Sequence, residues 1–330
     1  MKTFNTSIIA AAITAAAALT VAGQALAQTS PTFPTRAVTL VVPFTPSSGS
    51  DIIARIIAPK LAARWGQPVV VDNKPGASGN LGAKQVASAA PDGHTLLMAI
   101  NSFTMTPAVY KSMPFDAATD FTPVAKLAEA GYTFAVNTNL PVKDMASLIA
   151  YAKKNEGKLN YASPGNGTPQ HLAMELFKSG AGVNLVHVPF KGIQGALTDL
   201  MGGQVEMMFA TVHSMRPPVE SGKVRALAVT GITRNPLAPD VPTFREQGIT
   251  YMDSVDAWYA VLAPARTPAV LVARLNKDFI EVMNSDDVKA ALGKQGLSIK
   301  TSTPAQLEAI IKGDLARWKK VVTDAGISAD

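Results

Sequence analysis

From residue 37 onward, two patterns of apolar and polar residues alternate along the chain. Short runs of β-branched residues predict strands, and stretches in which apolar residues recur every three or four positions predict helices. The first part of this pattern predicts strand, helix, strand, helix and strand in turn, over 38–44, 51–65, 69–72, 79–89 and 95–100. Because this is a βαβαβ order, we expect a parallel sheet.

A second alternating series follows the extended segments at 121–136. It predicts helices and strands over 145–155, 160–162, 169–180, 185–188, 193–201, 206–209 and 225–229. Another apolar extended run spans 257–264, and two helices are expected to begin at Thr267-Pro268 and Thr303-Pro304. Gln306 completes a capping box with Thr303, which marks the start of the last helix.

The first 27 residues are typical of a cleavable secretory signal peptide. Lys2 is followed by an uncharged apolar run from Ile8 to about Gly23, and the small residues Ala25 and Ala27 predict cleavage after Ala27. No second stretch of 18 apolar residues follows. We therefore expect a soluble protein that is exported to the periplasm.

Composition narrows the classes of function. The sequence has no cysteine, so disulfides, thiolate metal sites, a cysteine nucleophile and a lipid-modified cysteine are excluded. Lysines and arginines are scattered, and removal of Lys2 with the signal lowers the net charge from +6 to +5, which argues against nucleic acid and only weakly favours an anionic ligand. No histidine or carboxylate spacing indicates a metal site, and we expect no cofactor. The 330 residues, 47% of them hydrophobic, suffice for two lobes.

Four loops that follow predicted strands share one chemistry. They are rich in glycine, serine, threonine and asparagine, and they span 45–51, 76–80, 101–104 and 163–168. In parallel sheets the ligand crevice lies beyond the carboxyl ends of the strands, where backbone N–H groups at helix N-termini attract anions. Turn and capping chemistry would explain any one loop alone. The four together predict a site for a carboxylate or another small oxyanion.

The candidate ligand-binding residues come mainly from these loops. Phe190 is added as an apolar wall, and Thr211 and His213 as polar groups after the strand that ends near Phe209. For Asp51, helix capping explains the residue almost as well as a ligand contact, and His171 is expected either near the ligand or bonded to its preceding loop. The full set is Thr45, Ser47, Ser48, Asp51, Gly76, Ala77, Ser78, Asn101, Ser163, Gly165, Asn166, Gly167, Thr168, His171, Phe190, Thr211 and His213.

Other residues have simpler interpretations. His187 lies within an apolar strand and is expected to be a core residue, whereas His94 follows a turn and is expected at the surface or in loop packing. Trp258 and Tyr259 are expected to form either a pocket wall or a strand packed on the core.

An ordered series of motifs resembles one family, the periplasmic solute-binding receptors of tripartite tricarboxylate transporters, also called Bug receptors. The matching stretches cover nearly the whole mature chain and are 41–44 with 51–55, 67–77, 91–98, 160–168 with 171–173, 188–192, 222–229, 238–244 and 258–268. The resemblance implies a two-lobed α/β fold of the periplasmic-binding-protein type (a Venus flytrap, type II-like), with crossing strands between the lobes. It also implies that backbone amides of the first-strand loop and of the Ser-Gly-Asn-Gly-like loop hold carboxylates, often through water, and that an integral-membrane permease receives the ligand.

On this basis we expect four regions. They are a signal peptide at 1–27, the first part of lobe 1 at 28–127, lobe 2 at 128–250, and a crossing strand with C-terminal helices returning mainly to lobe 1 at 251–330.

The sequence departs from the family pattern around the expected site. Ser47 and Ser48 stand where adjacent glycines are usual, and Ala210 replaces a common acidic residue. Asp256 is less usual before Trp258, and His94 replaces a common tyrosine. Loss of a carboxylate beside a gained imidazole suits a second anionic group or a flat ligand.

We therefore expect a monomeric receptor for a di- or tricarboxylate that performs no chemistry, with terephthalate, citrate and short aliphatic diacids as candidates. A periplasmic sensor that presents its ligand to a membrane signalling protein is the alternative, because both roles need the same loaded state. A hydrolase is disfavoured because Ser78 lacks the glycine spacing of a nucleophile elbow. A regulator's ligand-sensing module is disfavoured by the export signal and the absence of DNA-binding helices.

Overall fold

The computed structural model describes residues 33–253 and 255–327. The predicted signal peptide at 1–27 lies outside these residues. From Arg36 onward, the described residues form one compact unit. Within the described part, no helix combines the length and the apolar character that crossing a membrane requires.

The first sheet contains the predicted parallel βαβαβ unit. Strand β1 (Val38–Val42) pairs in parallel with both β2 (Val69–Asn73) and β3 (Thr95–Ile100), which confirms the expected topology. Strands β10 (Ala257–Pro264) and β4 (Phe121–Ala130) extend the sheet in antiparallel pairing. With the short β11 (Ser298–Ile299), the order is β11-β4-β10-β3-β1-β2.

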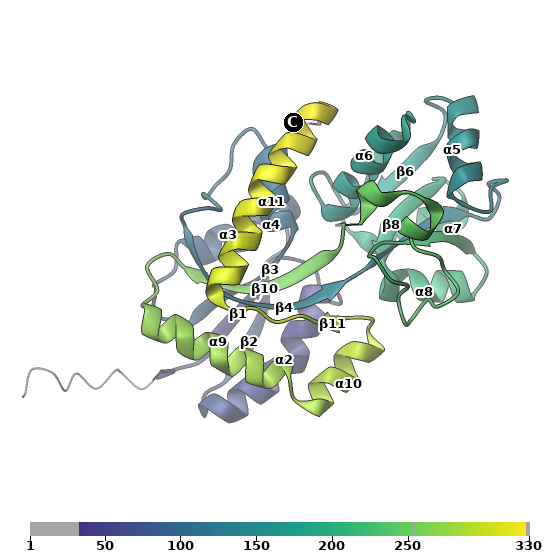
Figure 1. The fold of residues 1–330 in the computed structure, drawn as a ribbon. Coiled ribbons are helices and arrows are strands. Elements are labelled where there is room, and N and C mark those ends of the chain that lie inside the picture. Colours follow the sequence, from purple (N-terminus) through teal and green to yellow (C-terminus); the bar gives the residue numbers. More distant parts are fainter. Residues whose placement is uncertain (1–32, 254, 328–330) are drawn as a thin grey trace, which may run out of the picture. The chain divides into compact units, whose positions relative to one another are not determined.

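Helices cover both faces of this sheet (Figure 1). On one face lie three helices, α3 (Asn80–Ala87), α4 (Ser102–Val109) and α11 (Pro304–Ala325), whose apolar residues share one core with β1 and β10. On the other face lie α2 (Gly49–Trp65), α9 (Ala269–Met283) and α10 (Asp286–Lys294). Trp65 packs edge-on against Phe279, with ring centroids 6.0 Å apart. Both faces of β1 and β3 are therefore largely buried, whereas β2, at the edge of the sheet, is only half-buried.

The second sheet has five strands in the order β7-β6-β8-β5-β9. These are β5 (Tyr132–Asn137), β6 (Asn160–Ser163), β7 (Val186–Pro189), β8 (Met207–Thr211) and β9 (Val224–Val229). Strand β6 is parallel to β7 and β8, whereas β5 is antiparallel to β8 and β9. Figure 1 shows this sheet among α5 (Met145–Lys154), α6 (Pro169–Ala181), α7 (Ile193–Gly202) and α8 (Val212–Glu220).

Two paired strands carry the chain between the sheets. Strand β4 of the first sheet is separated from β5 of the second by Gly131 alone, and Ala130 pairs with Ala257 at the start of β10. The fold is therefore two-lobed and α/β, as the sequence predicts. The expected boundaries between the lobes, one between residues 127 and 128 and one between residues 250 and 251, remain predictions.

The structure adds elements that the sequence pattern did not predict. Helix α4 begins inside the expected loop at 101–104, and it contains Pro107. Helix α8 is only nine residues long and contains Pro217 and Pro218, which mask its helical pattern. Helix α10, strand β11 and three 3₁₀ turns, η1 (Ala77–Gly79), η2 (Arg245–Gln247) and η3 (Thr250–Met252), are also new. The capping box predicted at the start of α11 is confirmed.

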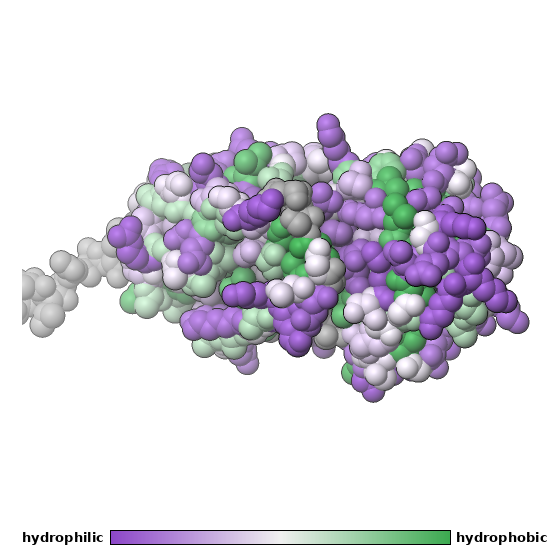
Figure 2. Space-filling model, turned by 90° about the horizontal axis from the view of Figure 1, so that it is seen from above, coloured by the Kyte–Doolittle hydropathy of each residue, from purple (hydrophilic) through white to green (hydrophobic). Residues whose placement is uncertain are grey.

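On the face of the molecule seen in Figure 2, hydrophilic residues are interspersed with hydrophobic ones. This agrees with the scattered charges of the sequence.

Candidate functional site

A cavity of about 740 Å³ is lined by loops from both sheets. Its wall includes residues that follow β1, β2, β6, β7 and β8, at the carboxyl ends of those strands. This is the position at which α/β proteins bind ligands. The volume lies within the range of about 300–1,000 Å³ typical of small-molecule sites.

Most of the candidate residues line this cavity. They are Thr45, Ser47, Ser48, Gly76, Ala77, Ser78, Gly165, Asn166, Thr168, Phe190, Thr211 and His213. Five candidates are not among the lining residues and lie behind the wall: Asp51, Asn101, Ser163, Gly167 and His171.

The first loop is held in shape from behind by Asp51. Ser47 adopts a left-handed backbone conformation (φ 67°), and its N–H donates to Asp51 Oδ2 at 2.9 Å. Ser48 is the N-cap of α2, and its hydroxyl accepts from the Asp51 N–H at 3.4 Å. A Cβ on Gly49 would come within 2.2 Å of the Tyr259 hydroxyl. Glycine is therefore required where the helix start meets this tyrosine.

Asp51 is almost fully buried and is bonded within the protein. Its carboxylate accepts from Arg55 Nε at 3.0 Å and from Asn73 Nδ2 at 2.9 Å. Burial alone would raise the pKa of Asp51, but the hydrogen bonds from Arg55, the Ser47 N–H and Asn73 outweigh it and lower this pKa below its ordinary value. Asp51 therefore ties the loop to the end of β2 as a carboxylate.

The second loop reaches toward the second sheet. Its residues Gly76, Ala77, Ser78 and Gly79 all have positive φ, at 134°, 46°, 54° and 100°. For alanine and serine such a conformation costs on the order of 1 kcal/mol or more, so tertiary contacts must hold it. One such contact is the Ser78 hydroxyl, which donates to the Asn166 carbonyl oxygen at 2.5 Å. It also lies 3.2 Å from the Tyr110 hydroxyl.

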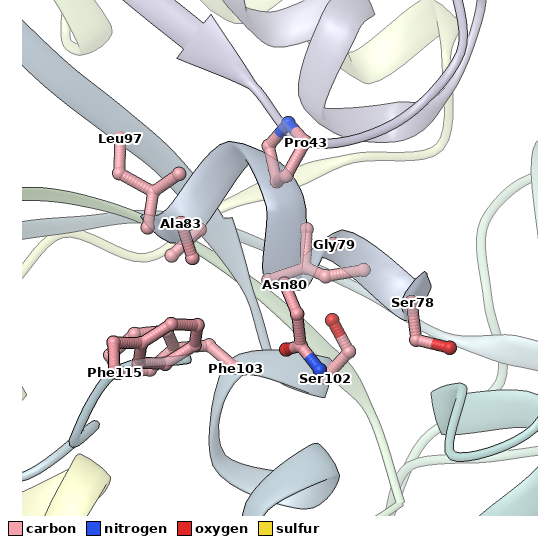
Figure 3. Close-up of a pocket in the computed structure, with 11 residues that line it drawn as sticks. Pro43, Ser78, Gly79, Asn80, Ala83, Leu97, Ser102, Phe103 and Phe115 are labelled. Atoms are coloured by element: carbon pink, nitrogen blue, oxygen red, sulfur yellow. The ribbon is translucent and has the colours of Figure 1, made fainter. Parts of the chain in front are cut away.

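Behind this second loop the first lobe is closely packed (Figure 3). The remaining space measures about 10 Å³, close to the minimum that a single water molecule needs. Asn80 and Ser102 point toward one another there, beside the stacked rings of Phe103 and Phe115, whose centroids are 5.8 Å apart. Thr106 donates to Asn80 Oδ1 at 3.0 Å. This space is therefore too small for a ligand of several atoms, which the 740 Å³ cavity can hold.

The third loop, from β6 to α6, is built on two glycines. Gly165 and Gly167 have φ values of 147° and 70°, which favour glycine. The Gly167 N–H donates to His171 Nδ1 at 3.0 Å, and the Thr168 hydroxyl donates to the Gly165 carbonyl at 2.7 Å. The Thr168 side chain makes no capping bond to the helix, although Thr168 is the N-cap of α6. The amides of the first turn are therefore not satisfied by this cap.

A serine–histidine pair lies beneath this loop. The Ser163 hydroxyl is 2.6 Å from His187 Nε2, but Ser163 is fully buried and does not line the cavity. A nucleophile has to touch its substrate. The pair therefore has the geometry of a structural contact.

The start of α8 brings neutral polar groups to the cavity wall. The Thr211 hydroxyl donates to the Ser214 hydroxyl at 3.0 Å and lies 3.3 Å from His213 Nε2. Burial lowers the pKa of His213 to about 4, so its imidazole is neutral at pH 7. The hydroxyls and the ring offer hydrogen bonds without adding charge.

Asn101 connects the end of β3 to the start of β10. Its Nδ2 donates to the Asp256 carbonyl oxygen at 3.2 Å. Asn101 thereby joins a loop of the first lobe to a strand that crosses between the sheets.

Sequence reasoning missed several wall residues. No feature of the sequence pointed to Tyr110 or Tyr132, whereas Gln170, Lys191 and Ser214 are each adjacent in the sequence to a candidate residue. Tyr259, for which a pocket wall was one expectation, does line the cavity. Lys191 is the charged residue among those that line the cavity. In the described part of the chain it forms no ion pair. Within 33–253 and 255–327, no group of three histidine, aspartate or glutamate residues could hold a metal ion.

Comparison with known proteins identifies the family. Residues 53–327 match the family described as "Tripartite tricarboxylate transporter family receptor". BugT of Bordetella pertussis is 33% identical over 92% of this chain and 94% of its own length. The UPF0065 protein of the tcbD-tcbE intergenic region of Pseudomonas sp. strain P51 is 37% identical, over 90% of this chain and 89% of its own length.

Solved structures give the same result. "R. palustris Rpa4515 with adipate" is 37% identical with a TM-score of 0.83, over 90% of this chain and 99% of that one. "MatC (Rpa3494) from Rhodopseudomonas palustris with bound malate" is 33% identical with a TM-score of 0.80, over 88% of this chain and 100% of that one. The chain belongs to the tripartite tricarboxylate transporter receptor family, the group that includes the Bug proteins.

Proposed function

We propose that this protein is a periplasmic receptor that binds a small dicarboxylate in the 740 Å³ cavity and delivers it to a membrane permease. One observation carries the proposal: loops from both sheets that are rich in glycine, serine and threonine, residues with neutral amide and hydroxyl donors, line the cavity, and Lys191 is the charged residue among them. Such neutral donors stabilise an oxyanion at close range. Delivery to a permease rests on the family, whose name describes transporter receptors.

The proposed ligand contacts are the candidates that line the cavity, from Thr45 in the first loop to His213 at the start of α8. Donors on opposite walls suit a ligand with a carboxylate at each end. Phe44, Phe190 and Tyr259 add apolar surface between them. An acid whose two carboxylates are joined by an apolar body fits this arrangement.

Four acids are the first to test. Adipate and malate occupy solved relatives, and terephthalate is a flat acid that suits the aromatic residues of the wall. Citrate is included as a tricarboxylate. We further propose that the ligand leaves unchanged, because the Ser78 hydroxyl is bonded to a backbone carbonyl and a tyrosine rather than to a base.

A thermal-shift screen of residues 28–330 tests the proposal. Each acid is compared with its uncharged diamide, and phosphate and sulfate serve as further controls. An acid present at a hundred times its dissociation constant should stabilise the protein by about 2.7 kcal/mol, whereas the matched diamide should not. NMR of the recovered acid should show it unaltered. Equal shifts with acid and diamide, no shift with any acid, or a consumed ligand would each contradict the proposal.

A further inference from the structure

Three aromatic rings form a stack behind the loop at 163–168, and Tyr161 and His171 are buried in it whereas His187 is half-buried. The ring centroids of Tyr161 and His187 are 4.7 Å apart, and those of His187 and His171 are 4.0 Å apart, with interplanar angles of 15° and 9°. These residues come from β6, β7 and α6, and none of them lines the cavity. The stack therefore contacts the loop from the side opposite to the proposed ligand.

Ring nitrogens of His187, in the middle of the stack, and of His171, at one end, contact the loop. His171 Nδ1 accepts from the Gly167 N–H at 3.0 Å, and His187 Nε2 lies 2.6 Å from the Ser163 hydroxyl. The oxygen of that hydroxyl accepts from the Gly165 N–H at 3.2 Å, and its proton has two acceptors in reach, His187 Nε2 and the Gly165 carbonyl oxygen at 3.1 Å, of which His187 is the nearer. Both histidines thus fix a glycine amide, one directly and one through Ser163.

The other end of the stack is anchored to α6. The Tyr161 hydroxyl donates to Glu175, which also accepts from Lys178 Nζ at 2.7 Å. Glu175 is nearly buried, so a compensating lysine beside it is expected. The rings are therefore held from both sides.

Three of the four backbone amides at 165–168 donate hydrogen bonds within the protein. Those of Gly165 and Gly167 are bonded to the stack and Ser163, and that of Thr168 donates to the Gly165 carbonyl at 3.3 Å. The Asn166 N–H has no acceptor among residues 33–253 and 255–327, and Asn166 lines the cavity. Its carbonyl is fixed by Ser78. The loop therefore keeps one amide donor at the wall, between two amides that are bonded away from it.

We propose that His171 and His187 are positioning residues for ligand binding, which hold the Gly167 N–H and the Ser163 hydroxyl so that the Asn166 N–H stays available to a ligand carboxylate. This inference rests on the proposed function. It assigns a role to His187, which was expected in the core but is half-buried on the edge strand β7. It also places His171 one layer behind the ligand.

The protonation states agree with this role. A histidine nitrogen can accept a hydrogen bond only when it carries no proton. Burial, with a smaller effect of Lys178, lowers the pKa of His171 to about 4. Burial, with the neighbouring His171, lowers the pKa of His187 to about 3. At pH 7 both rings are therefore neutral, and the proton of His171 resides on Nε2.

Matched variants separate the acceptor atom from the packing of the ring. His171→Phe keeps a stacked ring but removes the acceptor, whereas His171→Asn places Oδ1 where Nδ1 stands. We expect His171→Phe to bind the best of adipate, malate and terephthalate about tenfold more weakly in calorimetry, because a lost hydrogen bond leaves the Gly167 amide unsatisfied. His171→Asn should restore most of the affinity.

The same design applies to His187. His187→Gln reaches the position of Nε2 and should retain the affinity, whereas His187→Phe should lose it. If the histidines only stabilise the fold, both members of each pair will have a lower melting temperature and an unchanged dissociation constant. That result would overturn the proposal.

A second measurement does not depend on the variants folding. Long-range ¹H–¹⁵N NMR of the wild-type imidazoles at pH 7 should show an unprotonated Nδ1 and a protonated Nε2 on His171. A protonated Nδ1 would contradict the proposed bond. A wild-type protein that binds none of the acids contradicts the proposed function itself, whereas equal binding by the wild type and His171→Phe contradicts only the positioning role.

Discussion

The two sheets hold their cavity loops by different chemistry. In the first, the buried carboxylate of Asp51 takes the Ser47 N–H and is neutralised by Arg55. In the second, the neutral ring of His171 takes the Gly167 N–H. In both loops a side chain behind the wall bonds one amide, yet only the first depends on an ion pair. Because an anionic ligand is expected beside them, a neutral acceptor in the second loop avoids placing a negative charge near it.

The largest effect should follow from removing the charged support. Asp51→Ala deletes an acceptor shared by Ser47, Arg55 and Asn73, and we expect a loss of about 3 kcal/mol in the free energy of unfolding. Asp51→Asn keeps one carbonyl oxygen and should lose less. Urea denaturation measures both. An Asp51→Ala protein as stable as the wild type would contradict the role of the Asp51 carboxylate as the support of the first loop.

Acid should weaken the two supports in different pH ranges. Unfolded histidine has a pKa near 6.5, whereas the folded pKa of His171 is about 4, so the unfolded chain gains its proton first as the pH falls. Stability should therefore decline between about pH 6.5 and pH 4, by on the order of 3 kcal/mol from His171 alone. Asp51, whose pKa is lowered from 3.8, loses its contribution only below about pH 4.

One buried carboxyl opposes this trend. Burial raises the pKa of Asp256 to about 6, so its protonation stabilises the folded state as the pH falls from about 6 toward 3.8. Comparison of the wild type with His171→Asn by denaturation at pH 7, 6, 5 and 4 isolates the histidine contribution. The variant should show the flatter profile. Parallel profiles would show that His171 does not titrate as its burial requires.

A smaller effect is expected where the two loops touch. Ser78→Ala removes the hydrogen bond to the Asn166 carbonyl, and a neutral bond of this kind contributes about 1 kcal/mol. Ligand affinity measured by calorimetry should fall by a few-fold. Tyr110→Phe, which removes only the 3.2 Å contact with Ser78, should change affinity less. The reverse order would mean that the tyrosine, not the carbonyl, holds Ser78.

The smallest effect should come from the exposed charge of the wall. Lys191→Gln is expected to weaken acid binding by less than 1 kcal/mol, because exposed charge pairs are worth little, and the difference should shrink in high salt. Lys84→Gln, on the exposed side of α3, is the matched control. A large loss with Lys191→Gln that persists in high salt would mean that the lysine is buried against the ligand.

Local signals explain what the sequence predicted. The parallel unit follows from β-branched runs between helical stretches, and the start of α11 follows from Thr303, Pro304 and Gln306. The glycine- and serine-rich loops are recognisable because their residue types suit helix starts. These features depend on neighbours within a few positions, which a single sequence displays.

Long-range contacts explain what the sequence could not predict. Asp51 lies behind the wall because Asn73, 22 positions away, meets its carboxylate. The role of His187 depends on β6, β7 and α6 coming together, although it reads as a core residue in its own strand. The insertion of β10 between β3 and β4 is likewise a contact between distant segments. Helices α4 and α8 could not be predicted because both contain proline, which is strongly unfavourable inside a helix.

A crystal structure of residues 28–330 with the acid that gives the largest thermal shift would test the central claim most directly. We predict a carboxylate in the cavity, accepting from the Asn166 N–H, with the His171 Nδ1 bond to the Gly167 N–H intact. An acid bound outside this cavity, or bound within it without contact to either loop, would contradict the proposed function.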